Sequence, residues 1–90
     1  RLRSRDWYSG SVAPTIRRIG PYRFFFYGNE GFEPPHVHAQ RDARLAKFWL
    51  RPVALSSSVG FRPHELFEIE RIVREHEVEF EEAWHEFFDD

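Results

Sequence analysis

Two histidines separated by one residue are the most distinctive chemical feature of this 90-residue chain. His36 and His38 follow a stiff Glu33-Pro34-Pro35 segment and lie in a β-prone run, where residues two apart point to the same face of a sheet. Two imidazoles on one face can bind a metal ion, share proton transfer or hold a phosphate group. The segment from Gly28 to Leu50 is therefore the one that the other elements must position.

A ribonuclease-like use of the pair requires no cofactor. One imidazole would take the proton from a 2′-hydroxyl group, and the other would protonate the leaving oxygen, which suits the near-neutral titration of histidine side chains. Arginine or lysine side chains nearby could hold the phosphate charge that develops in the transition state. The candidate catalytic residues are His36 and His38, and the candidate substrate-binding residues are Arg23, Tyr27, Arg41 and Lys47.

Metal binding and a purely structural role are alternatives for the same two histidines. A His-X-His strand supplies two ligands, whereas a zinc site needs three or four. Other candidate ligands occur at no diagnostic spacing: Glu30, Glu33, Asp42, His64, His76 and His85. In a structural role, the pair would hydrogen-bond the loop at 29–33 and stack on Tyr27 or Trp49. The sequence assigns no metal ligands and no cofactor.

The composition predicts one small domain with a dense aromatic core. Ten Phe, three Trp and three Tyr compensate for the limited interior of so short a chain. Cysteine is absent, which excludes disulfides and thiolate metal sites and agrees with a reducing compartment. No apolar run approaches the roughly 20 residues that span a bilayer. We therefore expect a cytoplasmic protein that does not enter a membrane.

The two parts of the chain carry opposite charge. Residues 1–60 hold ten Lys and Arg against four Asp and Glu, whereas residues 61–90 hold three against eleven. A basic front part could contact RNA or an acidic partner, with basic groups meeting phosphates and aromatic rings meeting bases. The alternative is an acidic helix that forms ion pairs with a neighbouring sheet.

The pattern of residues predicts an α+β fold with a small antiparallel sheet of about four strands. The expected strands are 15–19, 22–27, 36–40 and 45–50, of which the first two form a hairpin. Residues 1–13 form an N-terminal extension, either disordered or upstream of the native start, and residues 14–90 form the single domain. Ser56–Gly60 is predicted to be a polar linker.

A C-terminal helical segment is expected to begin near Pro63 and to pack on one face of the sheet. Its apolar residues recur at helical spacing, and the pattern weakens at His76-Glu77, so a bent helix and two helices in series are both consistent with it. Because Phe25 and Tyr27 make the second face of the sheet apolar as well, that face should need a partner. We expect a homodimer or a hetero-complex.

These residues together resemble a known family. The matching runs are Pro14-Thr15-Ile16, Tyr22–Tyr27, Glu33-Pro34-Pro35-His36-Val37-His38, Ala46–Leu50 and Glu82–Phe88. They resemble the small bacterial proteins catalogued as domain of unknown function 4160, over about residues 13–88. The resemblance implies a compact α+β protein encoded beside another small gene, in what look like type II toxin-antitoxin modules. In that interpretation this chain would be the toxin and a cognate antitoxin its partner. Together with the chemistry of the paired histidines, this gives our leading hypothesis, a toxin that acts on RNA. The alternatives are a non-catalytic protein-interaction module and a small metal-binding protein.

Overall fold

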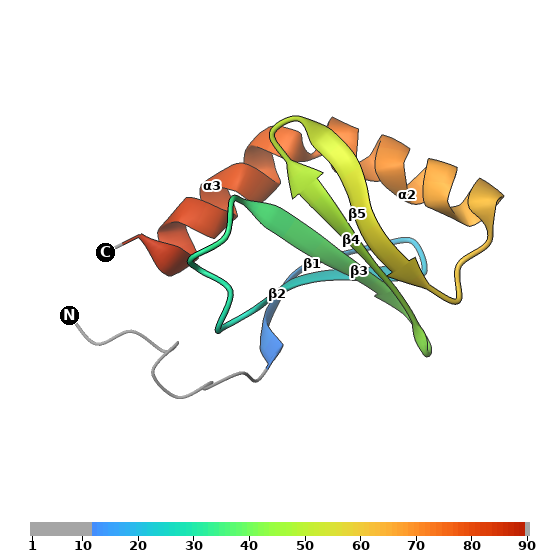
Figure 1. The fold of residues 1–90 in the computed structure, drawn as a ribbon, viewed down its shortest axis with the longest axis horizontal. Helices are drawn as coiled ribbons and strands as arrows, with labels where there is room; N and C mark the ends of the chain where they lie inside the picture. Colours follow the sequence, from blue (N-terminus) through green and yellow to red (C-terminus); the bar gives the residue numbers. More distant parts are fainter. Residues whose placement is uncertain (1–11, 90) are drawn as a thin grey trace.

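The computed structural model describes residues 12–89 and consists of a five-stranded antiparallel sheet followed by two helices (Figure 1). The strands lie in the sheet in chain order, each paired with the next. They are β1 (Val12–Ile19), β2 (Tyr22–Tyr27), β3 (His36–Arg41), β4 (Arg44–Leu50) and β5 (Val53–Val59), and the helices are α2 (Pro63–Glu75) and α3 (Glu77–Phe88). The predicted α+β class is confirmed. The predicted N-terminal extension lies outside the described residues, except that Val12 and Ala13 begin β1.

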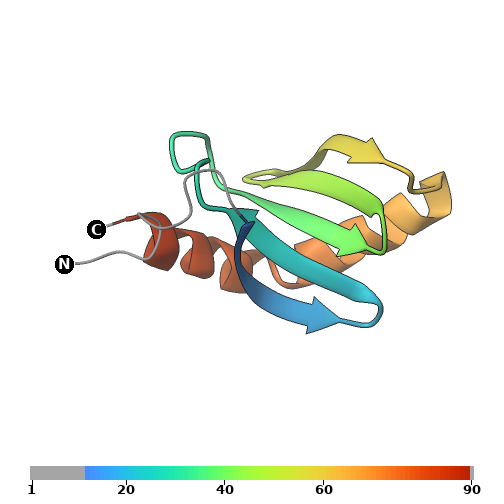
Figure 2. The ribbon, with the colours of Figure 1, turned by 90° about the horizontal axis from the view of Figure 1, so that it is seen from below.

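The core lies between one face of the twisted sheet and the two helices, which both lie on that side (Figure 2). Phe24 and Phe26 of β2 point into it and are at most 2% exposed. The Phe24 ring centre lies 5.1 Å from that of Phe80, and the Phe26 ring centre lies 5.3 Å from that of Trp84. Each buried aromatic removes roughly 150–250 Å² from water, so these contacts supply much of the stabilisation that a small domain needs.

The fifth strand corrects the predicted count of about four. Residues predicted to be a polar linker, Ser56 to Ser58, belong to β5, where Ser57 lies opposite Lys47 of β4. β5 is an edge strand and only Val53 of it is buried, so it lacks the alternation of apolar and polar residues that signals a strand. Exposed serines on an edge strand cannot be distinguished from a linker by their pattern alone.

The helical segment consists of two helices that meet at His76, which was one of the two predicted arrangements. His76 Nδ1 lies 2.9 Å from the Ile72 carbonyl oxygen, and its ring stacks on Phe80. α2 begins at Pro63, as expected for a first-turn proline. Among residues 12–89, no helix has the length and the apolar run that crossing a bilayer requires.

Ion pairs connect the basic sheet to the acidic helices. Arg17 of β1 pairs with Glu79, Arg44 of β4 pairs with Glu65, and Arg51 pairs with Glu81. In these three ion pairs, basic residues of the front part of the chain bind acidic residues of the C-terminal part and join the sheet to the helices. The prediction that a second molecule covers the other face of the sheet stays a prediction.

Candidate functional site

A loop between β2 and β3 brings a carboxylate to both histidines. The loop bends back through a hydrogen bond from the Glu33 backbone N–H to the Glu30 carbonyl, and Leu50 donates its backbone N–H to Pro35. Glu30 Oε1 then lies 2.7 Å from His36 Nε2 and 2.8 Å from His38 Nε2. The histidines thus belong to a cluster of three residues, Glu30, His36 and His38, which we call the triad.

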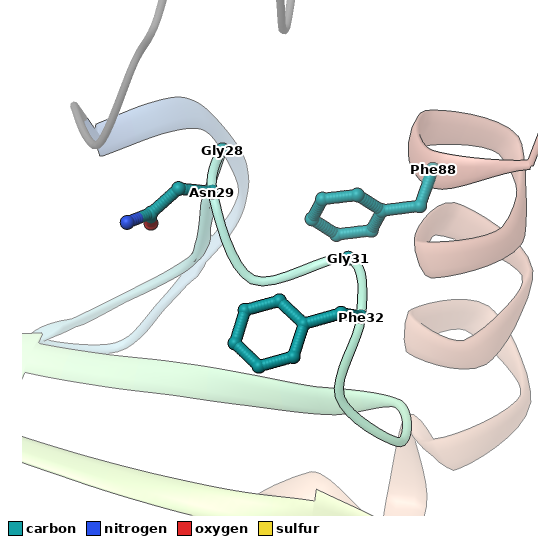
Figure 3. Close-up of a pocket in the computed structure, with 5 residues that line it drawn as sticks. All are labelled: Gly28, Asn29, Gly31, Phe32 and Phe88. Atoms are coloured by element: carbon teal, nitrogen blue, oxygen red, sulfur yellow. The ribbon is translucent and has the colours of Figure 1, made fainter.

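The end of α3 supports this loop from the other side. Gly31 lies so close to Phe88 that a Cβ atom on the glycine would be 2.5 Å from Phe88 Cδ1. A shallow pocket lies at this junction, and Gly28, Asn29, Gly31, Phe32 and Phe88 line it (Figure 3). Phe32, at the rim, is 84% exposed. Glu30 therefore reaches the histidines from a loop held between β3 and α3.

His36 is completely buried and both of its ring nitrogens face oxygen atoms. Its ring lies against Trp49 and Trp84, with ring centres 5.6 and 4.8 Å away. Nδ1 lies 3.0 Å from the Pro34 carbonyl oxygen, which can only accept, so Nδ1 must carry a proton. In a neutral ring, Nε2 then carries a lone pair that faces the carboxylate of Glu30. A cation, either a proton or a metal ion, must lie in that contact to make it attractive.

His38 differs from His36 because one of its nitrogens has no partner among the described residues. The residue is 4% exposed, Nδ1 is buried without a hydrogen bond, and the ring stacks on Phe25 at 5.4 Å. Burial lowers the pKa of His38, and the opposing effect of Glu30 does not compensate. Burial raises the pKa of Glu30, but its interactions with His38 and His36 outweigh burial and leave that pKa lowered. A neutral His38 thus donates Nε2–H to an ionised Glu30.

Three of the four predicted substrate-binding residues share the histidines' face of the sheet. His38 lies opposite Phe25 of β2 and opposite Lys47 of β4, which places Arg23 and Tyr27, two residues either side of Phe25, on that face. Their side chains are already engaged. Arg23 donates to Thr15 and Gln40 and lies over the Phe25 ring, whereas Lys47 pairs with Glu33 at 2.6 Å and lies over Trp49.

Arg41, the fourth predicted substrate-binding residue, is not brought to this face. Arg41 directly follows Gln40 on β3, so its side chain points to the other face of the sheet, on the helical side. There Arg41 acts to lower the pKa of Tyr22 and the pKa of Glu65. Glu30 is the residue that sequence reasoning did not place in the site. The sequence marks Glu30 only as one of several candidate metal ligands, six and eight residues before the two histidines. Because the sequence does not determine the path of the loop, it does not determine the distance in space between Glu30 and the histidines.

The triad can do two kinds of chemistry. Its three ligand atoms lie within 4.8 Å of one another, so it could hold a metal ion. Alternatively, Glu30 can orient His38 as a carboxylate orients a catalytic imidazole, leaving Nδ1 to exchange a proton. His36 offers no free nitrogen for such an exchange.

Comparison with known proteins identifies one related family. The family model described as "Domain of unknown function (DUF4160)" matches residues 22–85, from the start of β2 into α3. The matched span includes the triad, all of α2 and most of α3, and it ends before Phe88. No curated protein and no solved structure matches the chain.

Proposed function

The chain belongs to the family catalogued as domain of unknown function 4160, and we propose that it is an RNA-acting, ribonuclease-like protein. The observation that carries this proposal is that the two histidines of the triad share a sheet face with two basic side chains, Arg23 and Lys47, and with aromatic side chains. We further propose that it is the toxin component of a bacterial type II toxin-antitoxin module, with a cognate antitoxin as its partner.

The face around His38 has the chemistry that single-stranded RNA requires. Lys47 lies opposite His38 on β4, and Arg23 lies two residues from Phe25, which is opposite His38 on β2. Tyr27 is half-buried, with its ring centre 4.5 Å from that of His38. The cationic side chains can bind phosphate groups, and the half-exposed ring can stack on a base. Such binding tolerates different RNA sequences.

The two histidines have unequal roles in this proposal. Among the described residues, no group pairs with His38 Nδ1, whereas both ring nitrogens of His36 face oxygen atoms, so His38 is the residue that could exchange a proton with RNA. Glu30 orients His38 by accepting its Nε2–H, and His36 lies beside the same carboxylate oxygen. Because His38 Nδ1 is buried, the substrate must displace the side chains that cover the ring.

The test is inducible expression of the wild type beside His38→Ala, with His64→Ala as the matched control at an exposed histidine. Growth and total RNA integrity are scored, and circular dichroism establishes that each purified protein is folded. Growth arrest with RNA loss in the wild type and the control, but not in folded His38→Ala, is the expected result. A harmless wild type with intact RNA would overturn the proposal.

A non-catalytic protein-interaction module is the second candidate, and an apolar groove favours it. The groove lies between β5 and α2, with Phe48, Leu55, Leu66 and Phe67 in its lining. Leu55 is 42% exposed and Phe67 is 73% exposed, which is unusual for large apolar side chains that lie together. In this case Phe67→Ser would abolish association with the product of the neighbouring gene, while His38→Ala would leave it unchanged.

A further inference from the structure

We propose that Glu30, His36 and His38 bind one divalent first-row transition-metal ion through Glu30 Oε1 and the two Nε2 atoms. These ligand atoms lie within 4.8 Å of one another, and all three side chains are buried or half-buried. The oxygen of Glu30 lies between the two nitrogens, at 2.7 and 2.8 Å. The proposal concerns binding by this cluster and stands on its geometry, whether or not the chain acts on RNA.

The protonation of His36 is the first argument. The Pro34 carbonyl fixes the proton on Nδ1, so the Nε2 lone pair is aimed at the triad. Histidines that bind metals typically donate the other ring N–H to a backbone carbonyl or a carboxylate in this way. The carboxylate of Glu33, 3.6 Å from Nδ1, adds negative charge on the same outer side. His36 is therefore oriented as a ligand before any ion arrives.

The size of the cluster is the second argument. Zinc bound at about 2.0–2.1 Å by tetrahedral ligands would separate its ligand atoms by about 3.4 Å. The ligand atoms lie within 4.8 Å of one another, so the widest pair would shorten by up to about 1.4 Å, whereas the two contacts of Glu30, at 2.7 and 2.8 Å, would lengthen by about 0.6 Å. Glu30 can move because it lies on a loop rather than a strand. His38 can offer the Nε2 lone pair once its single proton moves from Nε2 to Nδ1, which has no hydrogen bond among the described residues.

The ligand set determines the class of ion. Two imidazoles and one carboxylate suit zinc, iron, cobalt or nickel, whereas magnesium and calcium prefer oxygen ligands alone. Three protein ligands leave at least one position for water or a phosphate oxygen, as in catalytic rather than structural zinc sites. If the chain acts on RNA as proposed, the ion would act as a Lewis acid on a phosphate oxygen of RNA, and only this role of the ion rests on the proposed function.

Titration of the chelator-treated full chain with Zn²⁺ by calorimetry tests the proposal, together with the visible absorption spectrum of the Co²⁺ form. We expect one ion per chain and cobalt bands of four- or five-coordinate intensity. Glu30→Gln and His38→Gln should each weaken binding at least about tenfold. His64→Gln, at an exposed histidine, should bind as the wild type does. Glu30→Gln is included because Glu30 lies on a loop, where the substitution should leave the fold intact.

Four outcomes decide between the two proposals. Stoichiometric binding that folded Glu30→Gln and His38→Gln lose supports the metal site. Absence of binding, or binding that both variants retain, overturns it. Metal binding without any RNA cleavage would sustain the site and refute the proposed function. RNA cleavage by chelator-treated protein that binds no metal would sustain the proposed function and refute the metal site.

Discussion

The ammonium group of Lys47 lies 2.6 Å from Oε1 of Glu33, so β4 is tied to the loop that carries Glu30. Both side chains are largely buried, and the pair is therefore screened less by salt than an ordinary surface pair. The same carboxylate oxygen lies 3.6 Å from His36 Nδ1. This pair holds the candidate site together and at the same time occupies the lysine that we propose binds RNA.

Glu33→Gln should strengthen RNA binding by releasing Lys47. The substitution removes one negative charge beside the triad and leaves an additional cation for phosphate, so affinity for single-stranded RNA at low salt should rise about two- to tenfold. Fluorescence anisotropy with a labelled oligonucleotide at several salt concentrations measures it. Glu82→Gln makes the same charge change on α3, at an exposed position, and should have a smaller effect. Equal effects in both variants would show that net charge alone is responsible.

His36→Ala should destabilise the fold more than His38→Ala. His36 is fully buried, contacts two tryptophans and has an oxygen atom beside each ring nitrogen, so its loss should cost about 3 kcal/mol through a cavity and the loss of the partner of the Pro34 carbonyl. His38 Nδ1 has no partner in the part of the chain that the structure describes, so the loss of His38 should cost less. Urea unfolding followed by tryptophan fluorescence checks this order. A reversed order would mean that the partners of His36 contribute little to stability.

Much of the sheet could be predicted because apolar residues alternate along it. Tyr22, Phe24 and Phe26 are spaced two apart, as the core face of a strand requires, and the structure buries all three under the helices. The spacing of Ile69, Val73, Phe80 and Trp84 predicted the helical layer in the same way. These signals are local, since each depends on residues within one element.

The triad and β5 could not be predicted in full because each depends on contacts between elements. Glu30 reaches His36 through the path of a loop, and no periodic pattern encodes that path. The pair His36 and His38 was predicted because two-residue spacing on a strand fixes their common face. Arg41 illustrates the same rule, because its odd separation from His38 places it on the opposite face.

Protonation of Glu65 should lower the free energy of unfolding as the pH falls into the acidic range. Its carboxylate accepts the Arg62 backbone N–H at 2.8 Å, which is the main cause of its lowered pKa, and it also pairs with Arg44. Because the folded-state pKa lies below the unfolded one, the stabilisation is fully present above the ordinary glutamate pKa of about 4.3 and is lost as the pH falls through the folded value. Glu65→Gln keeps the acceptor and removes the charge.

The difference in unfolding free energy between the wild type and Glu65→Gln should therefore be constant from pH 7 to about pH 5 and shrink below that. Urea titrations at a series of pH values measure it. Glu82→Gln, at an exposed position, is the matched control and should show a smaller dependence on pH. A difference that persists unchanged down to pH 2 would show that the neutral hydrogen bond, rather than the charge, stabilises the start of α2.

Gly31→Ala should displace the loop that carries Glu30, and removal of the Phe88 ring should restore it. The new Cβ atom would lie 2.5 Å from Phe88 Cδ1, so either the loop or the ring must move, at a cost of about 1–3 kcal/mol (Figure 3). In a Phe88→Ala background the same substitution meets no ring and should cost much less. Urea unfolding of the four proteins in this cycle gives the coupling, and zinc titration of the same proteins reports whether the triad follows. If Gly31→Ala costs the same in both backgrounds, the contact with α3 does not position the loop.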